Sequence, residues 1–128
     1  TPKEHVEEKM AQGKDVILEI EIQGALKVKK RYPEALLLFV TPPSAEELKR
    51  RLVGRGTESI EVINARLKRA AEEADGMEAY DYLLINDEID TCVEKMHQLI
   101  QLQHEKTSYH LDFLGKMRED LYHLDERN

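Results

Sequence analysis

Three short apolar runs constrain the fold of this chain more than any other feature of its sequence. They cover residues 16–22, 36–40 and 82–85, and helical patterns lie between them. Short, continuous apolar runs are typical of strands that are covered on both faces of a parallel sheet. Parallel strands also need long crossover connections, which are usually helices. We therefore predict an α/β fold with a short parallel sheet, in which the first two strands and the helix between them form a right-handed βαβ unit.

The first run changes character along its length. Residues 16–18 are all apolar, whereas acidic and apolar residues alternate over 19–22. Side chains alternate between the two faces of a strand, so we expect Glu19 and Glu21 to share one face, opposite the apolar side chains. Carboxylates are costly to bury without partners. The pair therefore indicates either a strand end that runs into solvent or one wall of a ligand site, and this stretch alone supports both interpretations equally.

All three runs end in polar or turn-forming residues. These ends are Glu19 with Glu21, the Thr-Pro-Pro of 41–43, and Asn86 with Asp87. A parallel sheet brings the carboxyl ends of its strands to one edge, and ligands bind at that edge in open α/β sheets. The sequence therefore predicts a ligand cleft there.

Capping residues and apolar periodicity predict six helices. Thr1, Pro2 and Glu4 carry the signals of a helix start, and Ser44 begins a capping box. The predicted helices lie before Gly13, over 25–31, from Ser44 to about 53, from about 59 to 74, after Asp87 as the cap, and over 107–124.

The last two helices carry apolar stripes at helical spacing. In the fifth helix the stripe consists of Ile89, Val93, Met96 and Ile100. In the tail helix it consists of Leu114, Met117, Leu121 and Leu124. A stripe as apolar as that of the tail is not expected to stay in water. We expect it to pack on the same chain or on a second subunit, which would make a homodimer.

Composition excludes several classes of protein. The chain has 128 residues, the size of one domain, and its net charge of −7 argues against a nucleic-acid partner. No apolar run approaches the ~18 residues of a membrane span, so we expect no membrane partner. Cys92 is the single cysteine, so the chain can form no internal disulfide, and its place beside Val93 favours packing over reactivity.

A set of arginines is the strongest local signal for chemistry. Arg51 and Arg55 are four residues apart, on a helix and in the glycine break after it, and Arg66 lies on the following helix. The guanidinium group is a planar fork of donors that suits phosphate oxygens. Gly54 and Gly56 flank Arg55, which would let this segment hinge as a closing lid must. The positive charge of this stretch, taken alone, is also typical of two basic helices that are simply exposed to solvent.

No phosphate-cradling P-loop, G-x-x-x-x-G-K-[ST], is present in this sequence. The two Gly-Lys pairs, Gly13-Lys14 and Gly115-Lys116, are followed by Asp15 and Met117 rather than by a hydroxyl residue.

Five segments, in this order, resemble guanylate kinase: LEIEIQG, FVTPPS, ELKRRLVGRGTES, INARL and YDYLLINDEID. The resemblance runs from residue 1 to about 104. It implies a partial three-layer nucleoside-monophosphate-kinase fold of the P-loop NTPase type, with a short parallel sheet and a helical lid. We expect residues 1–106 to form this portion, with the lid at about 44–74, and residues 107–128 to add a C-terminal helical tail.

The resemblance implies ATP-dependent phosphorylation of GMP in the cytoplasm, with Mg²⁺ as cofactor and with GMP and ATP as partners. On the GMP side it points to the Thr1 hydroxyl and to two carboxylates. Glu19 would face the GMP and the water shell of the magnesium, with no direct metal ligand in this chain. Glu21 would accept from the guanine amino group. The family usually has an aspartate there, and the longer side chain here would displace that contact or bridge it through water.

On the ATP side, Arg51, Arg55 and Arg66 resemble the lid arginines that gather on the transferred phosphate. Asn86 resembles the strand end beside the adenine, and Arg55 would also contact ATP. In the family, the P-loop and most of the GMP-binding region precede the position of Thr1. The chain therefore resembles a carboxyl-terminal portion, and we expect it to be inactive alone.

Two other functions are compatible with these segments. One is a guanylate-kinase-like binding module without catalysis, and the other is a nucleoside-monophosphate kinase for another base. Binding modules tend to lose the lid arginines, whereas all three are present here. The guanylate-type GRGTES lid argues against another base.

Overall fold

A two-stranded parallel sheet lies at the centre of the fold. The computed structural model describes residues 3–127, and their side chains as far as residue 124. Strand β1 (Leu38–Thr41) pairs with β2 (Tyr82–Ile85), with Leu38 opposite Tyr82 and Thr41 opposite Ile85. The connection between the two strands contains two helices, so this sheet is built on a long crossover as predicted.

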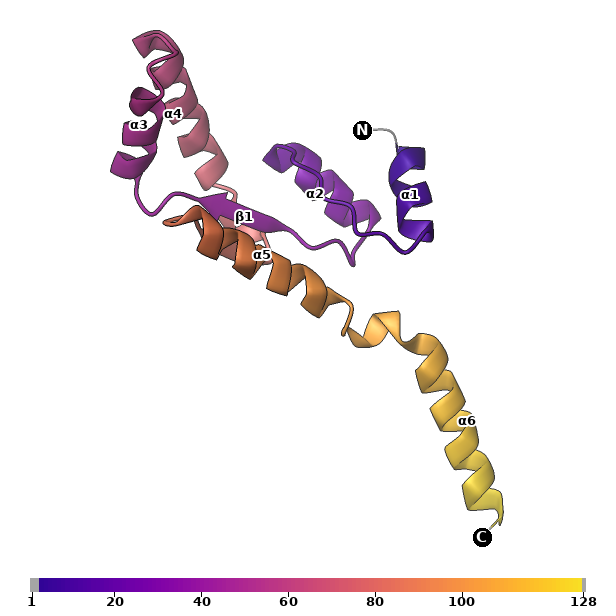
Figure 1. Ribbon diagram of the computed structural model, residues 1–128. Coiled ribbons are helices and arrows are strands. Elements are labelled where there is room, and N and C mark those ends of the chain that lie inside the picture. Colours follow the sequence, from indigo (N-terminus) through magenta and orange to yellow (C-terminus); the bar gives the residue numbers. More distant parts are fainter. Residues whose placement is uncertain (1–2, 128) are drawn as a thin grey trace.

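Six α-helices surround or extend from the sheet (Figure 1). Two 3₁₀ turns, Met77–Ala79 and Thr107–Tyr109, precede β2 and the last helix. The helices are α1 (Lys3–Ala11), α2 (Ile22–Arg31), α3 (Ala45–Gly54), α4 (Ile60–Ala74), α5 (Ile89–Gln103) and α6 (Leu111–Arg127). Their positions agree with the six predicted helices, while the proposed cap at Thr1 lies outside the described residues.

Helices α3 and α4 form a hairpin that projects from the sheet. Each begins at a serine cap: Ser44 Oγ accepts from the Glu47 N–H at 3.0 Å, and Ser59 Oγ accepts from the Val62 N–H at 3.3 Å. The turn between the helices contains Gly56 at φ 64°, a left-handed conformation that favours glycine. The predicted helix–glycine–helix element is therefore confirmed.

The predicted first strand is wrong. Residues 14–21 run as an extended segment, and the described part of the chain has only β1 and β2 in its sheet. The helix that follows begins at Ile22 rather than at about 25, because Glu21 caps it. Alternation in a sequence records which side chains share a face, but a strand also needs a neighbouring backbone to bond to. The predicted βαβ unit from this segment to β1 is therefore absent, and the parallel pair runs from β1 through α3 and α4 to β2.

Helix α5 lies against β2, and its predicted apolar stripe is partly covered, because Met96 and Ile100 are half-buried. The helix is capped by Glu88, not Asp87, and the cap makes no side-chain hydrogen bond. Cys92 is buried, which agrees with its predicted packing role, whereas Ile89 and Val93 are 67% and 58% exposed. The predicted stripe is therefore half-buried at Met96 and Ile100 and exposed at Ile89 and Val93.

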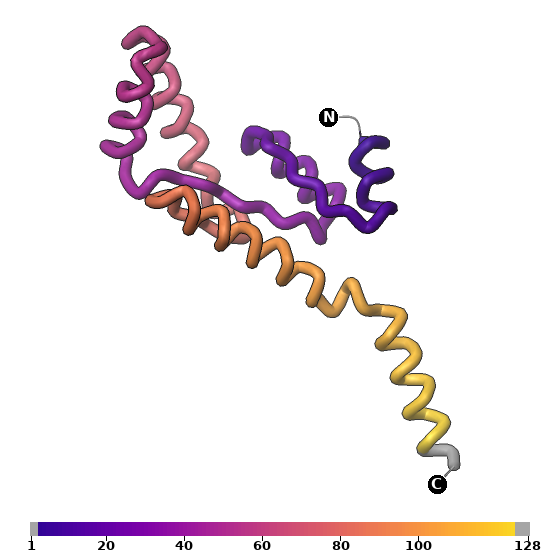
Figure 2. Tube along the Cα trace, viewed as in Figure 1, coloured from indigo at the N-terminus to yellow at the C-terminus, as the bar shows by residue number. Residues whose placement is uncertain are grey.

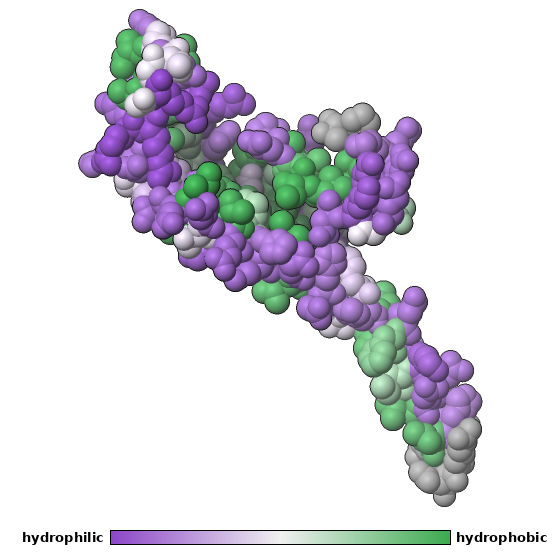
Figure 3. Space-filling model, in the orientation of Figure 1, coloured by the Kyte–Doolittle hydropathy of each residue, from purple (hydrophilic) through white to green (hydrophobic). Residues whose placement is uncertain are grey.

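The buried core is small. It consists of Ala25, Leu37, Leu52, Ile63, Leu84 and Cys92. Strand residues on either side of this core are exposed, among them Val40, Leu83 and Ile85. Figure 3 shows apolar surface between the helices at the centre of the molecule as well as on α6.

Helix α6 extends away from the rest of the chain (Figure 2). Within its predicted apolar stripe Leu114 is half-buried, while Met117, Leu121 and Leu124 are exposed. Of the two surfaces predicted to cover this stripe, the one on the same chain is therefore not used in this structure.

Candidate functional site

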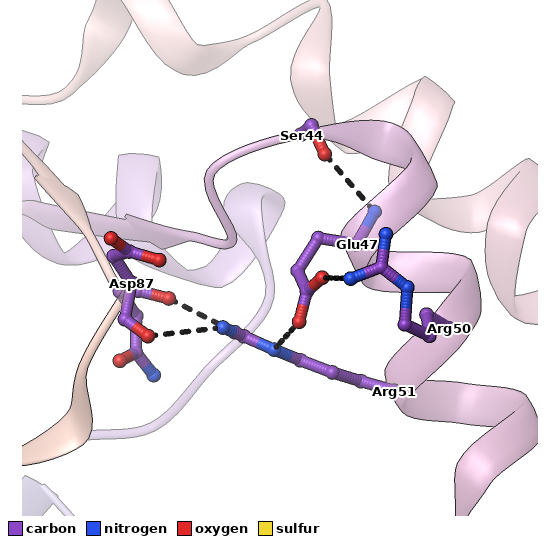
Figure 4. A network of polar contacts seen from close by, with 6 residues as sticks. Ser44, Glu47, Arg50, Arg51 and Asp87 are labelled. Carbon is purple, nitrogen blue, oxygen red and sulfur yellow. Dashed lines mark hydrogen bonds and ion pairs between the residues drawn. The ribbon is translucent and has the colours of Figure 1, made fainter.

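Arg51 ties the α3–α4 hairpin to the carboxyl end of β2 (Figure 4). Its Nη1 donates to the main-chain oxygen of Asn86 at 2.9 Å, and its Nη2 donates to that of Asp87 at 3.3 Å. Its Nε donates to Glu47 Oε1 at 3.0 Å. The guanidinium group thus bridges one carboxylate on its own helix and two carbonyls at the strand end.

Glu47 organises the first turn of α3. Its main-chain N–H is capped by Ser44, and its carboxylate forms ion pairs with both Arg50 and Arg51. The Arg50 side chain is 72% exposed, whereas that of Arg51 is 36% exposed. Glu47 stands four residues before Arg51, a spacing that favours a helical ion pair. The spacing of Glu47 and Arg51 is visible in the sequence and indicates this ion pair.

The structure brings two of the three predicted strand ends together. The Asn86 N–H donates to the Thr41 main-chain oxygen at 2.7 Å, which joins the ends of β1 and β2. Arg51 lies beside them through its contact with the Asn86 carbonyl. The catalytic candidate Arg51 and the ATP-binding candidate Asn86 therefore meet at one edge of the sheet, which is where the strand ends of a parallel sheet lie.

The other two predicted lid arginines have different environments. Arg55 is exposed and follows α3 as its C-cap residue. Arg66 lies on α4, and its Nη2 is 2.7 Å from Glu58 Oε1. The hairpin therefore carries all three arginines, with Arg51 at the strand edge, Arg55 at the turn and Arg66 on the returning helix.

Glu21 is held by the first turn of α2. Its Oε2 accepts from the Gln23 N–H at 2.8 Å, and its Oε1 accepts from the Gly24 N–H at 2.6 Å. A Cβ atom at position 24 would lie 2.8 Å from Glu21 Oε1, so a larger residue there would make the carboxylate shift from its place in the cap. The carboxylate is fixed as a helix cap rather than presented on a strand face.

A surface pocket of about 220 Å³ lies next to this cap and is strongly charged. Its lining residues are Glu21, Ile22, Gln23, Arg69, Glu72 and Glu73. Burial raises the pKa of the nearby Tyr80 phenol above its usual range, and the negative charges of Glu73 and Glu21 raise it further.

The other GMP-side candidate among the described residues, Glu19, does not line this pocket. Glu19 is exposed on the extended segment before α2. Thr1 lies outside the described residues. Within residues 3–127, no group of three or more histidine, cysteine, aspartate or glutamate side chains is placed to hold a metal ion. None of the described helices is both long and apolar enough to cross a membrane.

Comparison with known proteins gives consistent results. The family model of guanylate kinase matches residues 1–103. Guanylate kinase of Listeria monocytogenes is 46% identical over 121 residues, which cover 94% of this chain and 59% of the relative. Guanylate kinase of Halalkalibacterium halodurans is 49% identical over 106 residues, covering 83% of this chain and 52% of the relative.

The fold is also similar to a solved structure. The crystal structure of guanylate kinase from Anaplasma phagocytophilum matches with a TM-score of 0.67 at 32% identity, covering 83% of this chain and 50% of that one. The chain thus spans little more than half the length of these relatives, and its two strands and six helices form part of a nucleoside-monophosphate-kinase fold. By sequence and by fold, the chain belongs to the guanylate kinase family.

Proposed function

We propose that this chain serves the ATP-dependent phosphorylation of GMP, with Mg²⁺ and ATP as cofactor and co-substrate. The observation that carries the proposal is the α3–α4 hairpin, which bears Arg51, Arg55 and Arg66 and is tied to the carboxyl edge of the sheet. Phosphoryl transfer depends on positioning and on neutralising charge more than on covalent help from the protein. A hinged helical pair with three arginines supplies both.

The arginines have different parts in this proposal. Arg55 is exposed at the turn, where it can reach both the ATP and the transferred phosphoryl group. Arg66 offers the donors that its ion pair with Glu58 leaves free. Arg51 exchanges its carbonyl partners for phosphate oxygens when the lid closes, and Asn86 stays beside the adenine.

On the other side of the transferred phosphoryl group, Thr1, Glu19 and Glu21 bind GMP. Each oxygen of Glu21 accepts one N–H from α2 and keeps a lone pair for the donors of guanine. Glu19 is an exposed carboxylate, a hard ligand of the type that accepts from magnesium-bound water. Mg²⁺ would enter with ATP and supply charge neutralisation on the phosphates.

A chain without a P-loop motif should bind GMP without turning it over. No G-x-x-x-x-G-K-[ST] occurs in these 128 residues, and the lid arginines close over phosphates that another element must hold. Calorimetric titration of the chain with GMP and AMP tests binding, and a coupled ATP/GMP assay tests turnover. Selective GMP binding without turnover is the expected result.

The two assays separate the alternatives. Turnover that disappears in Arg55→Ala would support the kinase and contradict the inactivity of the chain. Absence of binding to any nucleoside monophosphate would favour the non-catalytic binding module, and preference for AMP over GMP would favour a kinase for another base.

A further inference from the structure

Glu58 makes an ion pair that differs from the others on the hairpin. It lies in the turn between α3 and α4, next to the cap residue Ser59, and its Oε1 is 2.7 Å from Arg66 Nη2. The Glu58 side chain is only 20% exposed. Its second oxygen, Oε2, is buried and has no hydrogen-bond partner among the described residues.

This environment makes the pair hard to separate. A carboxylate withdrawn from water needs a compensating charge, and removing one member of such a pair is strongly destabilising. Within the described chain, Arg66 is the ion-pair partner of Glu58. By contrast, the Arg69–Glu73 pair on the same helix joins an exposed arginine to a glutamate at 3.6 Å, a geometry that contributes little. Glu58 is therefore expected to keep Arg66 while other pairs on the lid exchange partners.

The pair leaves most of Arg66 available. A guanidinium group carries five N–H donors in a fixed plane, and the contact with Glu58 uses Nη2. The Arg66 side chain is 47% exposed, so its remaining donors are open to an incoming anion. Fixing one nitrogen restricts the rotation of the whole plane, which is what a preorganised phosphate contact requires.

We propose that Glu58 is a positioning residue that holds the guanidinium plane of Arg66 in place for the phosphate chain of the nucleotide. The proposal rests on the proposed function, because that function gives Arg66 its phosphate contact. It adds a role for the buried carboxylate at the base of α4, which acts only through Arg66.

The test uses the isotope-labelled 128-residue chain and the Nε–Hε NMR signal of Arg66, assigned through Arg66→Lys. The order parameter of this Nε–Hε group is compared in the wild type, Glu58→Gln and Glu58→Ala. Glu61→Ala is the matched control, because Glu61 is an exposed acid in the first turn of α4. Titration with inorganic tripolyphosphate then reports anion binding at the same signal, and calorimetry measures it in every variant, including those without Arg66.

Glu58→Ala should make the Arg66 signal mobile and weaken tripolyphosphate binding about tenfold, whereas Glu58→Gln, which keeps an acceptor, should weaken binding about threefold. Glu61→Ala should change neither. In an Arg66→Ala background the Glu58→Ala change should have no further effect on binding, because the two residues act as one unit. Circular dichroism checks that Glu58→Ala folds. If it does not fold, the comparison of Glu58→Gln with the wild type still tests the proposal.

An Arg66 signal that stays as ordered in the Glu58 variants as in the wild type would overturn the proposal. So would a binding defect of Glu58→Ala that persists in the Arg66→Ala background. A wild-type Arg66 signal that does not change when tripolyphosphate is added would instead contradict the phosphate contact that the proposed function gives to Arg66. The comparison of order would then still decide whether Glu58 positions this side chain.

Discussion

Tyr80 connects the sheet to the charged pocket beside α2. Its ring packs edge-to-face on Phe39, with 5.1 Å between the ring centroids. Burial raises the pKa of its phenol above the ordinary 10.0, and Glu73 and Glu21 add to the shift. The folded chain therefore holds this proton more tightly than the unfolded chain. As the pH rises from 10.0 towards the raised pKa, the folded state binds more protons, so stability is lost in that window.

Replacing Tyr80 with phenylalanine should remove this part of the alkaline loss. Urea unfolding of wild type and Tyr80→Phe at about pH 8 and about pH 11 measures it, and the difference in unfolding free energy between the two pH values should be smaller in the variant. Tyr109→Phe is the control, because Tyr109 is exposed. Equal losses in all three proteins would contradict the prediction.

At the same scale, Arg55 is the arginine whose effect should appear mainly in the transition state. In an active enzyme that contains this chain, Arg55→Ala should lower kcat about 10²–10³-fold while changing the KM for GMP far less. Steady-state kinetics with Lys49→Ala, an exposed lysine on α3, as control would check this. An effect on KM alone would show that Arg55 contributes uniform binding instead.

Helix α3 is anchored at its base by one side chain, which gives a prediction at the scale of the element. Arg51→Ala removes three donated hydrogen bonds and leaves the Asn86 and Asp87 carbonyls without these donors. The variant should lose about 1–3 kcal/mol of unfolding free energy in urea. Arg50→Ala is the matched control, because Arg50 shares Glu47 but is 72% exposed, and it should change stability by less than about 0.5 kcal/mol. Equal losses in both variants would mean that the carbonyl contacts contribute nothing.

Local signals in the sequence identified the helices well and one strand badly. Ser44 caps the helix that it was expected to cap, and the next helix starts near residue 59 as expected, because a helix start depends mainly on its own first turn. The segment 14–21 was expected to be a strand, but pairing depends on backbone far away in the sequence, which alternation does not reveal. The contact between Arg51 and Asn86 could be expected from the parallel topology of the sheet. The Glu58–Arg66 ion pair could not be predicted, because its residues lack the i,i+4 spacing of a helical pair.

At the scale of the whole molecule, α6 carries a set of exposed apolar side chains. Leu121 and Leu124 are 57% and 53% exposed on a helix that stands away from the body of the chain. We expect a second copy of the chain to cover this stripe, giving a homodimer. Light scattering should show a concentration-dependent dimer for the wild type and a monomer for residues 1–106.

A point variant separates the stripe from the rest of the tail. Leu121→Gln should weaken the association, whereas Arg118→Gln, on the same helix but outside the stripe, should not. A wild-type chain that stays monomeric at high concentration with a mobile tail would rule out both this dimer and packing on the same chain.

The clamp that Arg51 makes on the Asn86 and Asp87 carbonyls has a thermodynamic consequence for ligand selection. Under the proposed function, a phosphate chain must displace main-chain acceptors that already satisfy this guanidinium group. A small anion gains least from that exchange, because it has few charged oxygens with which to replace two carbonyls, whereas a triphosphate with several charged oxygens gains much more. The resting hairpin would thus set a threshold that inorganic phosphate fails to cross, and the cell's abundant free phosphate would leave the hairpin open.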